Sequence, residues 1–244
     1  MNSQRYIKNI YDKFAKEYHK KRLDKIRGFW NEHIENPSLL ELSKNHIKNK
    51  NILELGCGSG LFIKKILKYR PKSVTGLDMS EGLLEIAKKT YPQINFFQGS
   101  AEKIPFKKNM FDTVISGLTL HYIKDLSKVF GEVKRILKSG GNFIFSIHHP
   151  MMECTEKESR SGNEYILYPY NHNKEYKWKM MEGMELISYH HTFEYLINGL
   201  IKNGFTIQSI KETYPDKNSK KIKHEDFEKA NKYPFFLVIQ AKKS

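Results

Sequence analysis

The sequence predicts an α/β fold with a Rossmann-like, mostly parallel sheet. Short apolar runs of strand length alternate with amphipathic runs of helix length between residues 51 and 147, and the links between them are short. Such alternation is typical of right-handed βαβ units. A glycine-rich turn follows the first apolar run, and an aspartate ends the second. Polar groups in these places are expected at the sheet edge where open α/β folds bind ligands.

The first forty residues are helical in pattern. An apolar stripe recurs at helical spacing, with lysines between its members, and it consists of Tyr6, Ile10, Phe14 and Tyr18. A further helix is expected after Pro37. We therefore predict an N-terminal helical cap over residues 1–45.

The central part of the chain is expected to hold five strands and three helices. The predicted strands are 51–55, 73–77, 95–98, 111–116 and 142–147, and the predicted helices are 60–69, 81–90 and 125–137. Ser80 and Asp125 stand where side-chain caps begin the second and third helices. The glycine pair at 140–141 is expected to end the last helix.

The strand–helix rhythm stops after Pro150. Residues 151–190 are polar and aromatic, and their large rings are Tyr165, Tyr168, Tyr170, Tyr176 and Trp178. We predict that this segment is a lid insertion of irregular or hairpin structure over the substrate.

The rest of the chain is expected to return to regular structure. It reads as a helix at 192–203, strands at 205–211 and 235–241, and a lysine-rich loop at 216–224. No repeat or linker divides the chain, so we predict a single domain over 1–244. Its parts are the cap, a cofactor-binding core at 50–150, the lid at 151–190, and a C-terminal helix and last strands at 191–244.

The stretch NILELGCGSG carries the first chemical signal. Its glycines are Gly56, Gly58 and Gly60, a G-x-G-x-G spacing rather than the G-x-G-x-x-G of dinucleotide sites. Glu54 stands where a pyrophosphate would meet like charge, so its carboxylate suits a cationic ligand such as an ammonium group.

The next two strand ends carry further polar residues. Asp78 ends the second strand, where an acid accepts hydrogen bonds from ribose hydroxyls. The third strand is followed by Ser100, Ala101 and Glu102. Together these segments predict a ligand that is nucleoside-like, free of phosphate and partly cationic.

These residues carry a family resemblance. In order and spacing, the chain resembles the class I S-adenosylmethionine-dependent methyltransferases, and within them the small-molecule group called type 11. The segments concerned are LELGCGSG, GLDMS, GSAEKIPF, FDTVISGLTLHYIKD and EVKRILKSGGNFIFSIHHP. The resemblance implies a seven-stranded sheet with an antiparallel last strand, helices on both faces, and S-adenosyl-L-methionine as cofactor.

The resemblance also implies a role for each matching residue. Gly56, Cys57, Gly58 and Gly60 would pass under the methionine part, with Glu54 near its ammonium group. Asp78 would hold the ribose, and Met79 would pack on the adenine. Ser100, Ala101 and Glu102 would border the adenine's amino edge, Ser116 and Gly117 the methyl group, and Tyr11 and Tyr18 would close over the cofactor.

The sequence offers histidines as general bases. Methyl transfer needs alignment first, and it needs a base only when the attacking atom must lose a proton. His121 and His149 follow the fourth and fifth strands, whose ends face the cofactor in such a fold. Either is a candidate base, and packing is the alternative role for both. We predict no metal ligands.

Composition bounds the partners. The net charge is +15, but the positive residues are mostly lysines spread along the chain, which fits a solvated surface better than a nucleic-acid site. The cysteines, Cys57 and Cys154, give no disulfide pattern. No signal peptide or membrane span is expected, so the predicted location is cytoplasmic.

Several interpretations stay open. The predicted function is methyl transfer to the oxygen, nitrogen or carbon of a small molecule. One alternative is a tRNA or rRNA methyltransferase, although Ser116–Thr119 does not suit a flipped base. Another is a regulatory protein that binds the cofactor without catalysis. An NAD-type oxidoreductase is disfavoured by the glycine spacing, and a homodimer remains open because the N-terminal helix could cover a neighbour's pocket.

Overall fold

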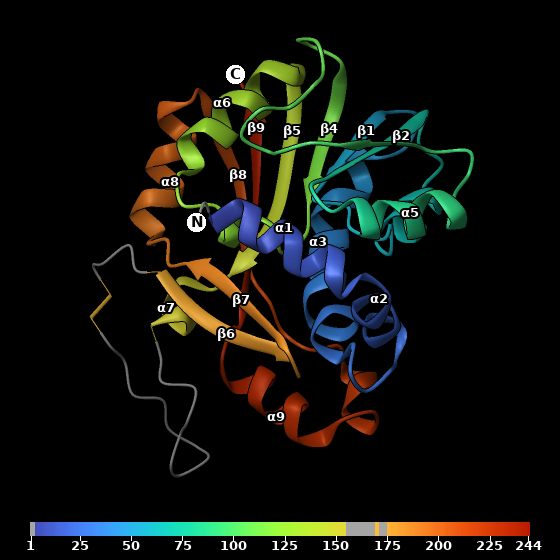
Figure 1. Cartoon of the computed structure of the whole chain (residues 1–244). Coiled ribbons are helices and arrows are strands. Elements are labelled where there is room, and N and C mark those ends of the chain that lie inside the picture. Colours follow the sequence, from blue (N-terminus) through green and yellow to red (C-terminus); the bar gives the residue numbers. More distant parts are fainter. Residues whose placement is uncertain (1–2, 155–168, 171–174) are drawn as a thin grey trace.

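A seven-stranded sheet forms the centre of the protein, in a computed structural model that describes residues 3–154, 169–170 and 175–244. The strand order is β3-β2-β1-β4-β5-β9-β8 (Figure 1). The strands are β1 (Asn51–Leu55), β2 (Ser73–Asp78), β3 (Asn95–Gln98), β4 (Phe111–Ser116), β5 (Leu137–His148), β8 (Phe205–Glu212) and β9 (Phe236–Lys243). β9 runs antiparallel to both of its neighbours, and the other pairs are parallel. The predicted fold class is confirmed.

Helices cover both faces of this sheet. They are α1 (Ser3–Lys13), α2 (Ala15–Leu23), α3 (Asn36–Ser43), α4 (Ile63–Leu67), α5 (Glu81–Thr90), α6 (Leu126–Ile136), α7 (Pro150–Glu153), α8 (Phe193–Lys202) and α9 (His224–Lys232). Shorter helical turns are the π-helix η1 (Trp30–Glu35) and the 3₁₀ turns η2 (Lys44–His46), η3 (Leu120–Tyr122) and η4 (Lys217–Lys221). α6 and α8 share one apolar layer with the sheet, and α3, α4 and α5 share the other.

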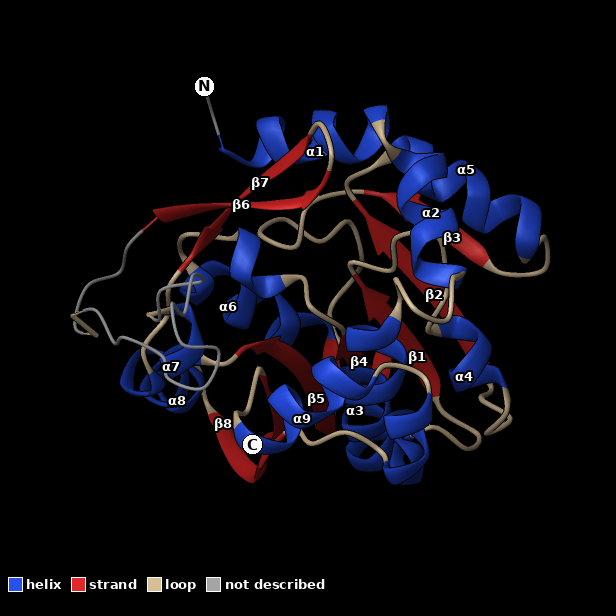
Figure 2. Cartoon of the chain, turned by 90° about the horizontal axis from the view of Figure 1, so that it is seen from below, coloured by secondary structure: helices blue, strands red, loops and turns tan. Residues whose placement is uncertain are grey.

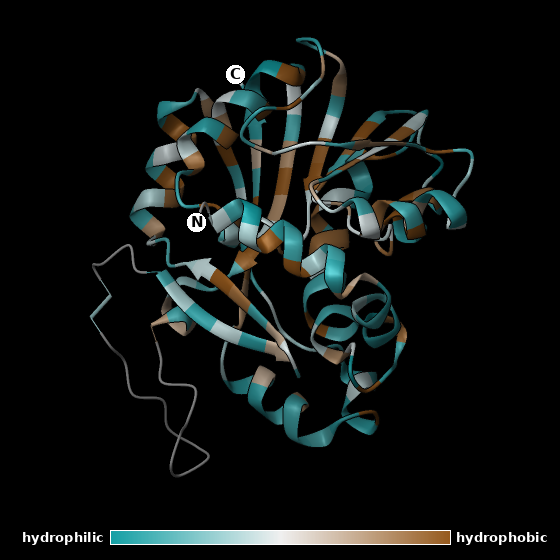
Figure 3. Ribbon diagram, in the orientation of Figure 1, coloured by the Kyte–Doolittle hydropathy of each residue, from teal (hydrophilic) through white to brown (hydrophobic). Residues whose placement is uncertain are grey.

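The strands supply both layers because successive side chains point to opposite faces. In β5, Phe143 and Phe145 pack with α6 and α8, whereas Ile144 packs in the layer of α3, α4 and α5. In β1, Leu53 and Ile52 divide in the same way. Figure 3 shows these central strands as the apolar part of the ribbon. Burial on both faces explains why the strands are continuous apolar runs in the sequence.

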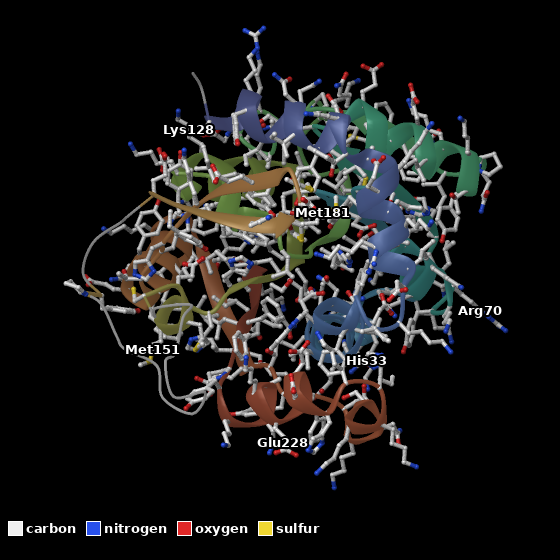
Figure 4. The ribbon with its side chains drawn as sticks, turned by 60° about the horizontal axis from the view of Figure 1, so that its bottom comes forward. His33, Arg70, Lys128, Met151, Met181 and Glu228 are labelled. Atoms are coloured by element: carbon white, nitrogen blue, oxygen red, sulfur yellow. The ribbon has the colours of Figure 1, made fainter. Side chains whose placement is uncertain are left out.

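The N-terminal helices and a hairpin gather at one end of the sheet (Figures 1 and 2). The hairpin is β6 (Glu175–Met181) paired antiparallel with β7 (Met184–Tyr189). Met184 and Leu186 pack on Ile7 of α1, and Met181 at the hairpin's tip joins this cluster (Figure 4). The segment predicted as a lid therefore contains a hairpin. Tyr165 and Tyr168 lie outside the described residues.

The structure differs from the sequence prediction in three elements. β5 begins at Leu137, before the glycine pair. Gly140 adopts a φ of +69°, which lets β5 bulge between Leu137 and Asn142, opposite Phe111 and Thr113 of β4. α4 covers only Ile63–Leu67 of the helix predicted at 60–69. α9 was not predicted. Within the described part of the chain, no helix has the length and apolar character that crossing a bilayer requires.

Candidate active site

A cavity opens at the end of the sheet where the parallel strands finish. Its volume is about 1070 Å³, with the open solvent at its mouth included. Its wall comes from the segments that follow β1, β2, β3 and β4, and its roof from α1, α2 and η1. This is the place where ligands bind in open α/β sheets.

The glycine turn forms the floor of the cavity. Glu54, Gly56, Cys57 and Gly58 line it. Gly56 has a φ of +73°, and a Cβ there would lie 2.1 Å from Thr119 Oγ1, so only glycine fits. Gly60 does not line the cavity, and its N–H donates to Cys57 O at 2.9 Å, which closes the turn.

Asp78 connects the turn to β2. Its Oδ2 accepts from Gly58 N at 2.7 Å, and its Oδ1 accepts from Ser80 N at 2.8 Å. Asp78 and Met79 line the cavity. Burial raises the pKa of Asp78, although these backbone donors oppose the shift. The α5 cap is Ser80, whose Oγ accepts from Leu83 N at 3.2 Å, so Asp78 is not needed as that cap.

The predicted adenine side is divided between the wall and the rim. Ala101 lines the cavity, whereas Ser100 and Glu102 do not. Ser100 Oγ donates to Gln4 Oε1 at 3.3 Å, and Gln4 Nε2 donates to Glu102. These two residues therefore contact α1, which lies over the cavity.

The two residues after β4 are also separated. Gly117 lines the cavity. Ser116 is fully buried, and its Oγ donates to Leu55 O at 2.8 Å, which ties β4 to β1. Ser116 thus supports the floor from behind.

Aromatic side chains form part of the roof, among them the two tyrosines that the resemblance placed over the cofactor. Tyr11 and Tyr18 line the cavity, with ring centroids 5.1 Å apart in an edge-to-face arrangement. Tyr122, from η3, also lines it, and its hydroxyl lies 2.8 Å from that of Tyr11. Burial raises the pKa of both Tyr11 and Tyr122, so these hydroxyls stay protonated at neutral pH.

Sequence reasoning missed Arg22, which lines the cavity from α2. Its Nη1 donates to Tyr18 Oη at 2.7 Å. Its Nε is buried, and among the described residues no group accepts a hydrogen bond from it. The only signal in the sequence is its position four residues after Tyr18, which places the two side chains on one helix face.

Sequence reasoning also missed Glu35, at the end of η1. Glu35 lines the cavity and is only 2% exposed. Its Oε1 accepts from Ser146 Oγ of β5. Burial raises the pKa of Glu35 to about 7, and the Ser146 hydrogen bond and Arg22 oppose the shift. No local sequence pattern marks Glu35, because the sequence does not predict how the helical turns of the cap are oriented relative to the sheet.

The two predicted histidines do not line the cavity. His121 is buried in η3, where its ring stacks on His148 with centroids 3.8 Å apart. His149 begins α7, and its Nε2 lies 3.3 Å from Glu212 Oε1. Burial lowers the pKa of His149.

Two buried polar atoms that lack hydrogen-bond partners among the described residues indicate that a zwitterionic ligand fits the cavity. Glu54 is 4% exposed, and its buried Oε2 has no hydrogen-bond partner among the described residues. Burial raises the pKa of Glu54 well above its usual value, and the carboxylates of Asp78 and Glu35 add to the shift. A bound ammonium group would satisfy this oxygen, and a bound carboxylate would satisfy Arg22 Nε. The methionine part of S-adenosylmethionine carries both groups.

Known proteins share this sequence and architecture. A family model described as a methyltransferase domain matches residues 53–145. An uncharacterized protein of Haemophilus influenzae is 31% identical over 96% of this chain and 97% of its own length. The demethylmenaquinone methyltransferase of Chlorobaculum tepidum is 32% identical over 57% of this chain and 58% of its own.

Solved structures agree. An S-adenosylmethionine dependent methyltransferase from Mesorhizobium loti superimposes with a TM-score of 0.73 at 26% identity, over 85% of this chain and 96% of that one. The fold, the cofactor-binding motifs and these relatives converge. The chain belongs to the class I S-adenosylmethionine-dependent methyltransferases.

Proposed function

We propose that this methyltransferase acts on a small molecule, with the cofactor held in the cavity described above. The observation that carries the placement is the pair of orphaned buried atoms, Glu54 Oε2 and Arg22 Nε, in one cavity. When bound, the cofactor supplies an electrophilic methyl group on a sulfonium. The protein's own residues bind and orient it.

In this proposal, Glu54, Arg22 and Asp78 each bind a different polar group of the cofactor. Glu54 accepts hydrogen bonds from the ammonium group, and Arg22 donates to the carboxylate. Asp78 holds the ribose hydroxyls with the carboxylate that already orders the glycine turn. Met79 and Ala101 border the adenine, and the tyrosines of the roof exclude water. Positioning of this kind accounts for much of the rate of a displacement reaction.

A small-molecule acceptor is supported by the enclosure of the cavity. α1 and α2 cover it from above, and the hairpin β6–β7 packs on α1. A relative of this chain is named for demethylmenaquinone, which is a small molecule. The remaining aromatic side chains of the predicted lid, Tyr170, Tyr176 and Trp178, stay candidates for the acceptor's surroundings.

Two finer predictions remain proposals. One is the histidine base. Neither His121 nor His149 lines the cavity, so an acceptor would reach either only past the residues of the wall. His121 is the better candidate of the two, because the residue that follows it, Tyr122, lines the cavity. The homodimer is not needed to close the site, since α1 covers the cavity of its own chain. Sedimentation of the protein at several concentrations tests the homodimer.

Calorimetry with S-adenosylmethionine and S-adenosylhomocysteine tests the placement. We expect Asp78→Ala and Glu54→Ala each to weaken binding about 10- to 100-fold, because each removes a charge-assisted hydrogen bond. Glu81→Gln is the matched control, because it changes an exposed carboxylate on α5 that does not line the cavity. Parent-like binding by both alanine variants would overturn the placement. Binding of NADH in place of either compound would overturn the cofactor itself.

A further inference from the structure

We propose that Glu35 is the general base of this enzyme, taking a proton from the acceptor atom that receives the methyl group. The inference rests on the proposed function, since it assumes the cofactor lies as described above. It concerns a buried carboxylate in the cavity wall to which neither the sequence nor the relatives assign a role.

An accounting of charges leaves Glu35 without a partner on the cofactor. The charged side chains that line the cavity are Lys8, Arg22, Glu35, Glu54 and Asp78, and Lys8 already pairs with Asp12 at 2.6 Å. In the proposed arrangement, the ammonium, the ribose hydroxyls and the carboxylate engage Glu54, Asp78 and Arg22 in turn. Since no further charged or hydroxyl group of the methionine or ribose remains, Glu35 is available to the acceptor.

Glu35 lies where the acceptor must come. A Cβ added to Gly117 would lie 3.3 Å from Glu35 Oε1, so the carboxylate lies beside the side of Gly117 that has no side chain. That backbone is the segment expected to border the transferred methyl group. Glu35 therefore faces the reacting end of the cavity rather than its adenine end.

The carboxylate is held in a fixed orientation. Leu118 N donates to Ser146 Oγ at 3.0 Å, so this hydroxyl is already an acceptor and turns its own hydrogen toward Glu35 Oε1. Ser146 is fully buried in β5. Such support from a second residue is what a catalytic group requires.

The local backbone is unusual at this residue. η1 is a π-helix, and the N–H of Asn36 donates to Asn31 O, five residues back. π-helical turns are rare and are frequently found at functional sites. This one is anchored on both sides: Glu32 pairs with Lys65 at 2.7 Å, and His33 Nδ1 lies 2.9 Å from Asp216 Oδ2. The π-turn brings Asn31, Glu35 and Asn36 to the cavity.

The proposed step balances. The acceptor's lone pair forms a bond to the methyl carbon as the sulfur–methyl bond breaks, and sulfur keeps the bonding electrons. The proton of the attacking O–H, N–H or acidic C–H passes to the Glu35 carboxylate. The products are the methylated acceptor, neutral S-adenosylhomocysteine and protonated Glu35. The acceptor class is thus a nucleophile that still carries a proton on its attacking group at neutral pH, such as a phenol, an enol or an uncharged amine.

The charges around Glu35 poise it for this task. Arg22 on α2, Lys65 on α4 and the Ser146 hydroxyl favour the carboxylate, whereas burial, Glu32 on the same turn and Glu54 on β1 oppose it. The resulting pKa of about 7 is well matched to a base that works near neutral pH. Neither predicted histidine lines the cavity, so Glu35 is the better-placed group.

The first test separates catalysis from cofactor binding. Glu35→Gln and the control Glu81→Gln, an exposed residue outside the cavity, are compared with the parent in calorimetry with S-adenosylmethionine. We expect all three proteins to bind within about twofold of one another, because Glu35 does not hold the cofactor. Infrared difference spectra should show a buried carboxyl that titrates near pH 7 in the parent and is missing from Glu35→Gln. Cofactor binding weakened more than about tenfold in Glu35→Gln would overturn the proposal and make Glu35 the ammonium partner.

The second test measures turnover. Labelled S-adenosylmethionine is incubated with a small-molecule bacterial extract supplemented with phenols and amines, and S-adenosylhomocysteine formation is followed. We expect Glu35→Gln to lower the rate at least about 100-fold and the control Glu81→Gln to leave it unchanged. The parent's rate should fall as the pH drops through about 7, and Ser146→Ala should move this fall to higher pH, because it removes a hydrogen bond that lowers the pKa of Glu35.

The outcomes are distinct. Parent-like turnover in Glu35→Gln, with a large loss in His121→Gln, would overturn the proposal in favour of the histidine. If the extract supplies no acceptor, the calorimetry and the infrared titration still test the proposal. A Glu35 carboxylate that stays unprotonated down to pH 5 would overturn its role as the base. A parent that fails to bind S-adenosylmethionine would instead contradict the proposed function.

Discussion

The ionised Glu35 carboxylate lowers the free energy of unfolding of the ligand-free protein. A buried carboxylate whose pKa is raised to about 7 in the folded state, against 4.5 as the ordinary value, binds its proton more tightly when folded. The stability it contributes is therefore fully present below about pH 4.5 and is lost as the pH rises to about 7. A catalytic group that destabilises its own fold is a common trade-off.

This cost is measurable. We expect the free energy of unfolding of cofactor-free Glu35→Gln to be close to that of the parent at pH 5 and to exceed it at pH 8, by up to about 3 kcal/mol. Urea unfolding at the two pH values measures the difference. The exposed Glu81→Gln should show no such gain. A gap between Glu35→Gln and the parent that is the same at both pH values would contradict the raised pKa.

The charged residues next to the glycine turn could be predicted, whereas the charged residues of the roof could not. Glu54 and Asp78 end strands whose direction follows from the βαβ pattern, so their side chains had to meet at one edge. Arg22 and Glu35 reach the cavity only through the tertiary placement of α2 and η1. Helical periodicity gives the faces of a helix but not the neighbour that each face contacts.

The N-terminal helices are fastened to the rim of the cavity at separate points. Asp12 Oδ1 on α1 accepts from Ser80 Oγ at 2.7 Å and from Gly82 N at 3.1 Å, which joins α1 to the start of α5. His19 on α2 lies 2.8 Å from Ser59 Oγ of the glycine turn. These contacts hold the tyrosines of the roof in place.

Loosening α1 should speed release of the product cofactor. We expect Asp12→Ala to raise the dissociation rate of S-adenosylhomocysteine about tenfold, because it removes two hydrogen bonds of a charged group. Stopped-flow displacement measures this rate. Glu17→Ala on α2 is the control, since Glu17 is exposed and does not line the cavity. Equal rates in the parent and Asp12→Ala would show that α1 does not limit release.

The elements that the sequence predicted well include strands that are continuous buried runs, β1 and β4, and a helix with one apolar face, α5. β1, β4 and α5 match their predicted ranges within one residue. α9 was missed because Ala230 is its only buried residue, so its apolar pattern is too weak to mark a helix. The start of β5 was misplaced because a glycine pair signals a turn as well as a bulge.

The charge of the molecule bears on its partners. With a net charge of +15, the protein should attract any polyanion at low salt. We expect tRNA binding in a filter assay to fall steeply between about 50 and 200 mM salt, and to be matched by RNA of random sequence. Bound S-adenosylmethionine should leave it unchanged. Retention of one tRNA over random RNA at the higher of these salt concentrations would instead support the RNA methyltransferase alternative.

The global arrangement could largely be predicted from the sequence. The order of the motifs indicated the family, and the family implied the sheet with its antiparallel β9. The hairpin β6–β7 belongs to a segment for which only irregular or hairpin structure was expected. Its contacts with α1 depend on side chains far apart in the chain, such as Ile7 and Leu186, and no local pattern reports such pairs.

The π-helical turn makes the reacting end of the cavity sensitive to the length of the chain. Loss of any one residue between 30 and 35 would restore ordinary α-helical pairing and rotate the helix beyond the deletion by about 100°. Glu35 would then leave the wall, while the glycine turn, Asp78 and Glu54 kept their positions. Deletion of one codon in this stretch would thus leave a protein that binds S-adenosylmethionine but does not transfer its methyl group.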